Sequence, residues 1–385
     1  MAANQKLLQA ELKSLLETIS ISSEQLACLH EAPLESPSGL EEIETALVRL
    51  FKAMLTIDPS LGVSGPRSSE DGSLRSGQQG GYGNSEIGSM RVLQEKKEVY
   101  KDECAKFLSR LKNFLQIQFG AAIDETRKAL EREKGNNLTR SAGKVKLDPR
   151  NHDLARAVLW KYSPLMLFSR EVNRLEWEDI IKMYEVVCKG LYQDEFREAV
   201  FSWKRVVRKP TGDEGDILFT AQAEKQTEGI ATTARKLTVK RSQTLAKSLR
   251  SPVGDNSSKT SVEKTPDGRL HPYEVFAGAL EEMVPIVSME QNFVVEFFHV
   301  TSLEQNDFPD AVTVALPDSR RGGDLRRPKV MDPNRELARL VVQCMDDIYS
   351  FFPGDLQALV DWSLQADPLY ATFSPLISVI TLIFL

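Results

Sequence analysis

Apolar side chains that recur every three or four residues limit what this chain can fold into more than any other feature. The pattern is clearest over residues 174–208, where one face carries Trp177, Ile180, Ile181, Tyr184, Val187, Cys188, Leu191, Tyr192, Ala199, Trp203 and Val206. The opposite face carries Glu178, Asp179, Lys182, Lys189, Asp194 and Glu198. This is the period of an α-helix with one packed and one solvated face. The segment therefore predicts a long amphipathic helix.

The N-terminal region predicts a pair of helices. Residues 1–30 place Leu8, Leu12, Leu15, Ile19, Leu26 and Leu29 at helical spacing. Pro33 and Pro37 are expected to end this helix, because proline lacks the N–H that a helix interior needs. Ser38, followed three residues later by Glu41, has the spacing of a capping box and predicts the start of a second helix.

A longer helical pattern runs from about residue 90 to residue 134, and we expect Gly120 to be its weak point. Residues 154–168 are strongly apolar, and Pro164 is expected to end or kink a helix there. The pattern resumes over 273–300 with Pro285 inside it. The β-branched and aromatic run at its end could form a strand, but its length and the preceding phase favour helix.

The last helical pattern starts near Asp332, which we expect to be the cap, with Pro333 in the first turn. Pro353, Gly354 and Asp355 predict a sharp turn into a final helix. Only residues 312–316 hint at a strand. The sequence therefore predicts an all-α protein.

Polar segments separate these patterns. Residues 59–89 contain 8 Gly and 8 Ser, and residues 135–151, 209–270 and 302–331 are also poor in large apolar side chains. Such segments bury too little surface to offset the entropy of ordering them. We therefore expect an N-terminal helical pair (1–58), a disordered Gly/Ser-rich loop (59–89), a helical bundle (90–208), a disordered basic Ser/Thr-rich loop (209–270), a second bundle that is truncated (271–368) and an apolar tail (369–385).

Composition excludes several classes of protein. The chain has 385 residues, with 55 acidic and 49 basic side chains, and a nucleic-acid-binding protein would normally show a basic excess. The four cysteines, Cys28, Cys104, Cys188 and Cys344, form no CxxC pair, so a disulfide scaffold is excluded and buried thiols in a reducing compartment are expected. The N-terminal sequence has no secretory signal pattern.

No catalytic, cofactor or metal site is predicted. The histidines His30, His152, His271 and His299 are far apart and have no ligand spacing. Adjacent acidic pairs, such as Glu41–Glu42 and Asp346–Asp347, diverge on a helix and are typical of solvated charge. The Gly-rich stretch lies outside any strand-to-helix turn that could hold a phosphate. An all-α enzyme would need a pocket with convergent titratable groups.

Two basic clusters admit two interpretations. Residues 225–250 carry seven Lys or Arg against Glu228, and residues 319–329 carry five against Asp324. Either could contact an anionic membrane or an acidic partner. Thr238, Thr244, Ser251 and Thr265 also have kinase-like contexts, in which a phosphate would cancel the local positive charge. The favoured interpretation is a solvated loop whose charge prevents collapse.

The C-terminal residues 369–385 differ in character, because 12 of the 17 are apolar. A helix that crosses a membrane needs about 20 apolar residues, and Pro375 interrupts this stretch. A short tail anchor is one interpretation. Sequence foreign to the native fold is the favoured one.

Three segments carry a resemblance to a known family: MRVLQEKKEVYKDECAKFLSRLKNFL (90–115), YSPLMLFSREVNRLEWEDIIKMYEVVCKGLYQDEFREAV (162–200) and DPNRELARLVVQCMDDIYSFFPGDLQALVDWSLQADPL (332–369). They resemble the helical C-terminal region of exocyst complex component 1, the Sec-three-type subunit, in its fungal form, and the resemblance extends over residues 1–369. It implies an elongated rod of stacked helical bundles with long disordered loops. It also implies a non-catalytic scaffold of the complex that tethers secretory vesicles to the plasma membrane.

The resemblance implies that the other exocyst subunits are partners through helical packing, with no cofactor and no nucleic acid. The implied location is the cytoplasm, peripheral to the plasma membrane at sites of polarised secretion. Family members begin with a pleckstrin-homology-like domain that binds phosphoinositides and Rho-family GTPases. We expect this chain to be a fragment without that domain, so neither activity is assigned to its residues, and membrane contact by the basic loops or the tail is expected to be weak. The alternative function is a stand-alone helical adaptor anchored by its tail.

Overall fold

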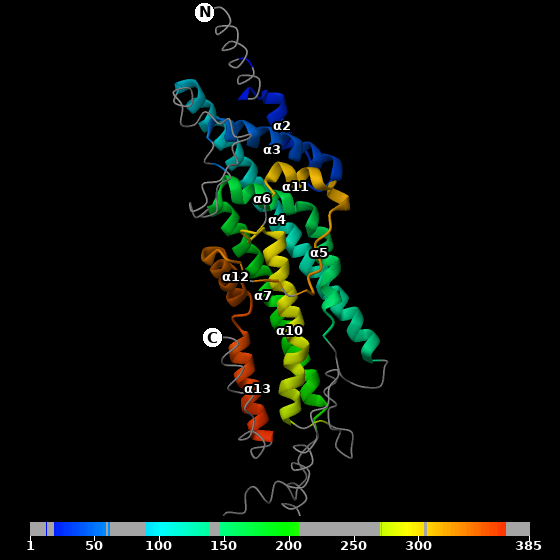
Figure 1. Ribbon diagram of the computed structural model, residues 1–385. Helices are drawn as coiled ribbons and strands as arrows, with labels where there is room; N and C mark the ends of the chain where they lie inside the picture. Colours follow the sequence, from blue (N-terminus) through cyan, green and yellow to red (C-terminus); the bar gives the residue numbers. More distant parts are fainter. Residues whose placement is uncertain are drawn as a thin grey trace, which may run out of the picture. The chain divides into compact units, whose positions relative to one another are not determined.

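The computed structural model describes residues 19–58, 90–138, 147–207, 272–303, 306–327 and 332–366, with Lys13, Leu61, Leu270, Lys329 and Val330 (Figure 1). The described chain is helical, and its one β-feature is an isolated bridge between Val207 and Leu270. The all-α prediction is confirmed. The expectations for loop residues 62–89 and 209–269 and for the tail 369–385 lie outside the described residues.

The chain divides into two compact units. The first contains residues 1–142, 146–198 and 281–352, and the second contains 143–145, 199–280 and 353–385. The first unit therefore contains helices from the predicted N-terminal pair (1–58), from the predicted bundle (90–208) and from the predicted second bundle (271–368). Its core is rich in buried aromatic rings. Successive edge, tilted and stacked contacts connect Phe119, Tyr184, Phe293, Phe297 and Phe298.

The N-terminal helices begin at residues other than those that the sequence predicts. Helix α2 spans Ser23–Glu31, and Ser22 caps it through a capping box with Gln25, so a single helix over 1–30 is wrong. Helix α3 spans Pro37–Ile57 and is capped by Ser36, not Ser38. Pro37 begins this helix instead of ending the previous one, because its fixed φ suits the first helical position and its missing N–H has no partner to lose there.

Helix α4, Arg91–Leu138, is unbroken over 48 residues, which is about 72 Å at the rise of an α-helix. The predicted apolar face is confirmed, since Tyr100, Phe107, Leu111 and Leu115 are buried. Gly120, which the sequence predicts to be the weak point, does not interrupt the helix. Glycine lowers helix propensity by only about 1 kcal/mol, and the packing of the surrounding turns outweighs that cost.

The apolar segment after α4 forms a broken helix. It consists of η1 (Pro149–His152), α5 (Asp153–Leu159), η2 (Trp160–Tyr162) and α6 (Ser163–Val172). Pro164 lies in the first turn of α6, and the preceding helical turn ends just before it, as the sequence predicts. Helix α7, Arg174–Arg205, then follows and confirms the clearest helical pattern in the sequence.

Helix α10, Pro272–Phe297, contains Pro285 and continues through the aromatic run, which confirms the helical interpretation of that run. It ends where His299 adopts a left-handed conformation, with φ of 56°. The Val300 N–H donates to the Val295 carbonyl at 3.0 Å, which is the bond of a Schellman cap. The His299 ring is held by Ser163, whose hydroxyl oxygen lies 2.9 Å from Nε2.

The segment 302–331 is more ordered than the sequence predicts. It contains α11 (Phe308–Val314) and η4 (Pro317–Ser319), so the expectation of a disordered gap is wrong. The hint of a strand over 312–316 is also wrong, because residues through Val314 are helical. One fully buried ring explains the order: Phe308 packs against Phe51 and Phe168 at centroid distances of 5.8 and 5.0 Å.

The last two helices keep their predicted order but not their predicted caps. Asn334, not Asp332, caps α12 (Arg335–Ile348), and Asp332 instead accepts hydrogen bonds from Ser302. Helix α13, Phe352–Ala366, begins before the expected Pro353 turn.

Within the second unit, Gly278 lies so close to Trp203 that an added Cβ would be 2.1 Å from the indole.

Replacing either of two glycines in the first unit by alanine is expected to change the free energy of unfolding, in opposite directions. Replacing Gly120 by Ala is expected to raise the free energy of unfolding by about 0.5–1 kcal/mol, because alanine favours helix and nothing lies within 4 Å of the new methyl group. Replacing Gly39 is expected to lower it, since the Cβ would lie 2.3 Å from the Pro33 carbonyl oxygen. Urea denaturation measures both changes. A stabilising Gly39→Ala would contradict the close approach.

Candidate functional site: a buried polar network

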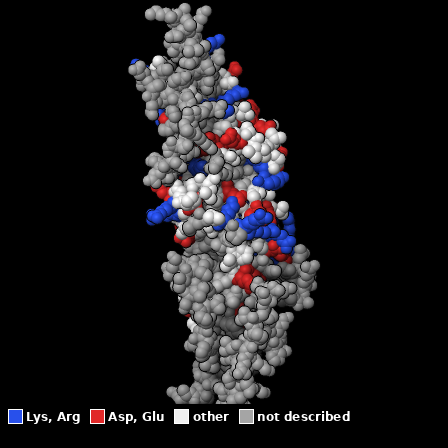
Figure 2. All heavy atoms as spheres, viewed as in Figure 1, with Lys and Arg blue, Asp and Glu red and all other residues white. Residues whose placement is uncertain are grey.

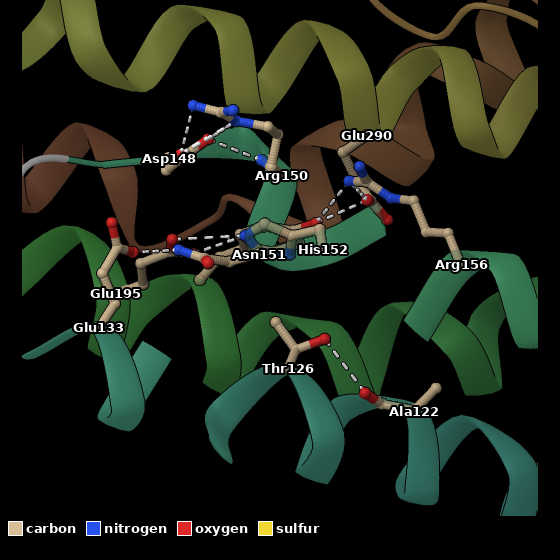
Figure 3. A network of polar contacts seen from close by, with 11 residues as sticks. Ala122, Thr126, Glu133, Asp148, Arg150, Asn151, His152, Arg156, Glu195 and Glu290 are labelled. Atoms are coloured by element: carbon tan, nitrogen blue, oxygen red, sulfur yellow. Dashed lines mark hydrogen bonds and ion pairs between the residues drawn. The ribbon is translucent and has the colours of Figure 1, made fainter. Parts of the chain in front are cut away.

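A carboxylate with no exposed surface lies at the centre of the first unit. Glu290 on α10 accepts hydrogen bonds from the hydroxyls of Tyr184 and Tyr192 on α7, at 2.6 and 2.5 Å. Arg156 on α5 donates from Nη2 to Oε2 of Glu290 at 2.6 Å (Figure 3). Helices α5 and α7 therefore contribute the donors to one buried anion on α10, which is distant from both in sequence.

The environment keeps the ions charged and the phenols neutral. Burial alone raises the pKa of Glu290, but Arg156 and the two tyrosine hydroxyls lower it by more, and the net pKa lies below the ordinary value. Burial raises the pKa values of Tyr184 and Tyr192 well above their usual range. Burial alone would lower the pKa of Arg156, but Tyr192 and Glu290 raise it by more.

A second buried pair adjoins this cluster. His152, at the end of η1, places Nε2 at 3.1 Å from Oε2 of Glu195 on α7, and both side chains are buried. The His152 ring also stacks on Tyr192, with a centroid distance of 5.3 Å and an interplanar angle of 19°. Tyr192 thus links the two pairs, because it donates to Glu290 and stacks on His152, and Figure 3 shows the neighbouring polar residues of η1 in the same view.

A further buried ion pair joins α3 to the segment after η4. Arg320 donates from Nη1 and Nη2 to the two carboxylate oxygens of Glu44, at 2.6 and 2.7 Å. It also donates to the main-chain carbonyls of Lys161 and Ala315. A bidentate pair of this kind fixes orientation as well as distance. The prediction that residues 319–329 form a solvated loop is therefore wrong for Arg320.

The geometry suits support rather than chemistry. The Glu290 carboxylate and both tyrosine hydroxyls are buried, so a substrate has no approach to them. Burial raises the pKa of the Cys104 thiol to about 12 and that of Cys188 well above its usual range, so neither is a ready thiolate. Across the described ranges, no group of three or more His, Cys, Asp or Glu is placed to hold a metal ion.

The residues that the sequence analysis weighed are separate in the fold. His30 contacts Glu103, His152 contacts Glu195 and His299 contacts Ser163, while His271 lies outside the described residues. Cys104, Cys188 and Cys344 are buried free thiols as predicted, but Cys28 is only half-buried. The acidic residues Glu41, Glu42, Asp346 and Asp347 are exposed, as predicted.

Sequence reasoning missed Glu44, Arg156, Glu290 and Arg320. A signal was available for Glu290, which falls in the apolar phase of its helix, four residues after Ile286 and three before Phe293. A charge at such a position is either exposed by a local break or paired in the core. The identity of its partner depends on the fold.

The exposed helix faces carry charges of both signs. Lys112 on α4 pairs with Asp179 on α7 at 2.9 Å, and Arg174 pairs with Glu178 at 2.9 Å. Figure 2 shows basic and acidic side chains next to one another over the described part of one face. No helix in the described part of the chain is both long and apolar enough to cross a membrane.

Two segments of the chain match family models. Residues 1–56 match the model described as exocyst complex component Sec3, coiled-coil, and residues 297–376 match the one described as exocyst complex component Sec3, C-terminal. The second match ends inside the apolar tail. No curated protein and no solved structure matches the chain. The resemblance of residues 90–115 and 162–200 lies between the two matches and stays a prediction.

The central ion pair is expected to contribute strongly to stability. Replacing Glu290 by Gln leaves Arg156 as a buried charge without a counter-ion, which should lower the free energy of unfolding by about 3 kcal/mol or more. The matched control is Glu178→Gln, which breaks a half-exposed pair and should cost less than about 1 kcal/mol. Urea denaturation at neutral pH measures both. Equal effects would contradict the central role of Glu290.

The same pair predicts a pH dependence. Because the folded-state pKa of Glu290 is lowered, its contribution to stability is complete above the ordinary value of 4.5 and is lost as the pH falls through the folded pKa. The stability difference between the native chain and Glu290→Gln should therefore be constant near neutral pH and shrink below pH 4.5. Denaturation curves over a pH series measure this. A difference that grows on acidification would contradict it.

Proposed function

We propose that this chain, an exocyst Sec3-type protein, is a non-catalytic helical scaffold that helps tether secretory vesicles to the plasma membrane. The proposal rests on the two matches to the exocyst family. Its proposed partners are the other exocyst subunits, which it contacts through helical packing. Its proposed location is the cytoplasm, peripheral to the plasma membrane at sites of polarised secretion.

One structural observation carries the proposal. The two matched segments are separated by residues 57–296, yet described residues of the first segment contact residues 308–320 of the second within the first unit. Glu44 of the first segment forms the bidentate ion pair with Arg320 of the second, and Phe51 packs against Phe308. Two elements of one family that share a core are expected to act as one structural module.

The charge distribution also supports a scaffold. Glu290 and Glu44 form ion pairs with Arg156 and Arg320 inside the fold, and these pairs hold the helices in register. The outer face of α7 keeps exposed apolar side chains, because Leu175 and Val186 are each 76% exposed and lie about 20° apart around the helix. Apolar side chains that remain exposed on a helix are available for packing against a partner helix.

The tail-anchored adaptor is not favoured by any observation. It depends on residues 369–385, which lie outside the described residues. The Sec3 C-terminal match extends through residue 376 and therefore includes the first part of that tail. Phosphoinositide and Rho-GTPase binding are assigned to no residue of this chain.

Co-purification tests the proposal. The tagged full chain, expressed in cells with a native exocyst, is expected to capture the other exocyst subunits. The double variant Leu175→Glu, Val186→Glu should reduce the captured amount about tenfold or more, because it places two charges in an apolar contact. The control Val330→Glu changes a side chain that is 85% exposed on another segment and should capture normally. A folded wild-type chain that captures no exocyst subunit would contradict the proposal.

A further inference from the structure

Helix α12 lies beside α7 in the first unit, and both of its ends are attached to that helix (Figure 1). Near the start of α12, Oε2 of Glu336 lies 3.4 Å from Nη1 of Arg174. At its end, the Tyr349 ring stacks on the Phe196 ring, with a centroid distance of 5.7 Å and an interplanar angle of 20°. An exposed ion pair and a buried aromatic contact therefore align the two helices.

A buried carboxylate lies between these two contacts. Glu185 on α7 is 7% exposed, and its hydrogen-bond partner on α12 is the thiol of Cys344, which is 1% exposed. Among the described residues, Glu185 takes part in no ion pair. Lys182, one turn earlier on α7, is exposed and pairs with Asp179 instead. The middle of the contact between α7 and α12 thus holds an acid whose partner is a weak, neutral donor.

This arrangement differs from that of three other buried carboxylates in the same unit. Each of those lies against a basic side chain, in the pairs Glu290–Arg156, Glu44–Arg320 and Glu195–His152. Glu185 faces Asp347 of α12, and this like charge makes an ionised carboxylate less favourable still. The described contact is therefore compatible with a neutral Glu185 and is opposed by an ionised one.

The titratable groups around Glu185 agree with this conclusion. Burial is the largest effect on the pKa of Glu185, and with Asp347 it outweighs the opposing effects of Cys344 and Lys182, so the net pKa is raised above 4.5. Burial, Glu185 and Glu290 raise the pKa of Cys344 above its usual range, so the thiol remains a neutral donor. Because the folded-state pKa of Glu185 is raised, its cost to the docked state is absent below 4.5 and grows as the pH rises through the folded pKa.

We propose that α12 is a detachable helix whose docking on α7 is controlled by the protonation of Glu185. A neutral Glu185 stays buried against Cys344 without the cost of burying a charge. When Glu185 loses its proton to solvent, a buried anion without a cation remains, and release of α12 returns that anion to water. Release also uncovers the apolar face of α12, which contains Leu337, Val341 and Ile348. This proton-linked contact lies in the segment that matches the Sec3 C-terminal model.

Hydrogen–deuterium exchange of the full chain tests the proposal from pH 4.5 to neutral pH, with labelling times corrected for the intrinsic pH dependence of amide exchange. The protection of α12 amides is expected to fall several-fold over this interval in the native chain. In Glu185→Gln it should stay constant, because glutamine cannot ionise. The matched control is Glu178→Gln on the same helix, which changes a carboxylate paired with Arg174 and should keep the native profile.

Amides of α10 serve as the internal reference, because they report on opening of the whole unit. Glu44, whose pKa burial also raises, is the same in every variant and cannot account for a difference between them. A fall in α12 that is absent from α10 and from Glu185→Gln supports the proposal. Native α12 protection that does not fall overturns it, as does an equal fall in Glu185→Gln or in α10.

A second variant keeps the test decisive if Glu185→Gln does not fold. Asp347→Asn changes an exposed side chain and removes the like charge that faces Glu185. It is expected to reduce the loss of α12 protection, because the folded-state pKa of Glu185 moves closer to its ordinary value. An unchanged loss in Asp347→Asn would overturn the proposal.

Discussion

The fold depends on keeping one ionised carboxylate away from water. Glu290 has no exposed surface, so the free energy of its desolvation must be offset by Arg156, Tyr184 and Tyr192 at distances of 2.5–2.6 Å. Apolar side chains tolerate small sliding movements between helices, because dispersion contacts are not directional. Hydrogen bonds to a buried anion are directional. The register between α5, α7 and α10 is therefore fixed by polar atoms inside an otherwise aromatic core.

The pair between Glu44 and Arg320 applies the same constraint over a longer separation in sequence. Burial raises the pKa of Glu44 in spite of its contact with Arg320, which shows that desolvation of this carboxylate is costly. The bidentate geometry makes Arg320 bind α3 in one orientation only. Together with the burial of Phe308, this contact orders a segment that is too polar to order itself.

The sequence predicts the long helices well, because helical periodicity is a local property. The patterns over α4 and α7 need no knowledge of distant residues, and both helices are confirmed. The caps at Ser22, Ser36 and Asn334 were missed, because several Ser, Asp and Asn residues compete within a few positions. Only the exact backbone geometry decides which of them meets the free N–H groups.

The sequence could not show which charged residues are buried, because the buried and the solvated ones are of the same residue types. Arg320 and Arg321 are adjacent and identical in type, yet one is buried on Glu44 and the other stands at a cavity rim. The difference arises from a partner 276 positions away in sequence. Burial of the first arginine also sets the position of the second, because Gly322 and Trp160 hold the chain that follows. The position of Arg321 thus depends on the contact between Glu44 and Arg320, which joins the two segments that match the family models.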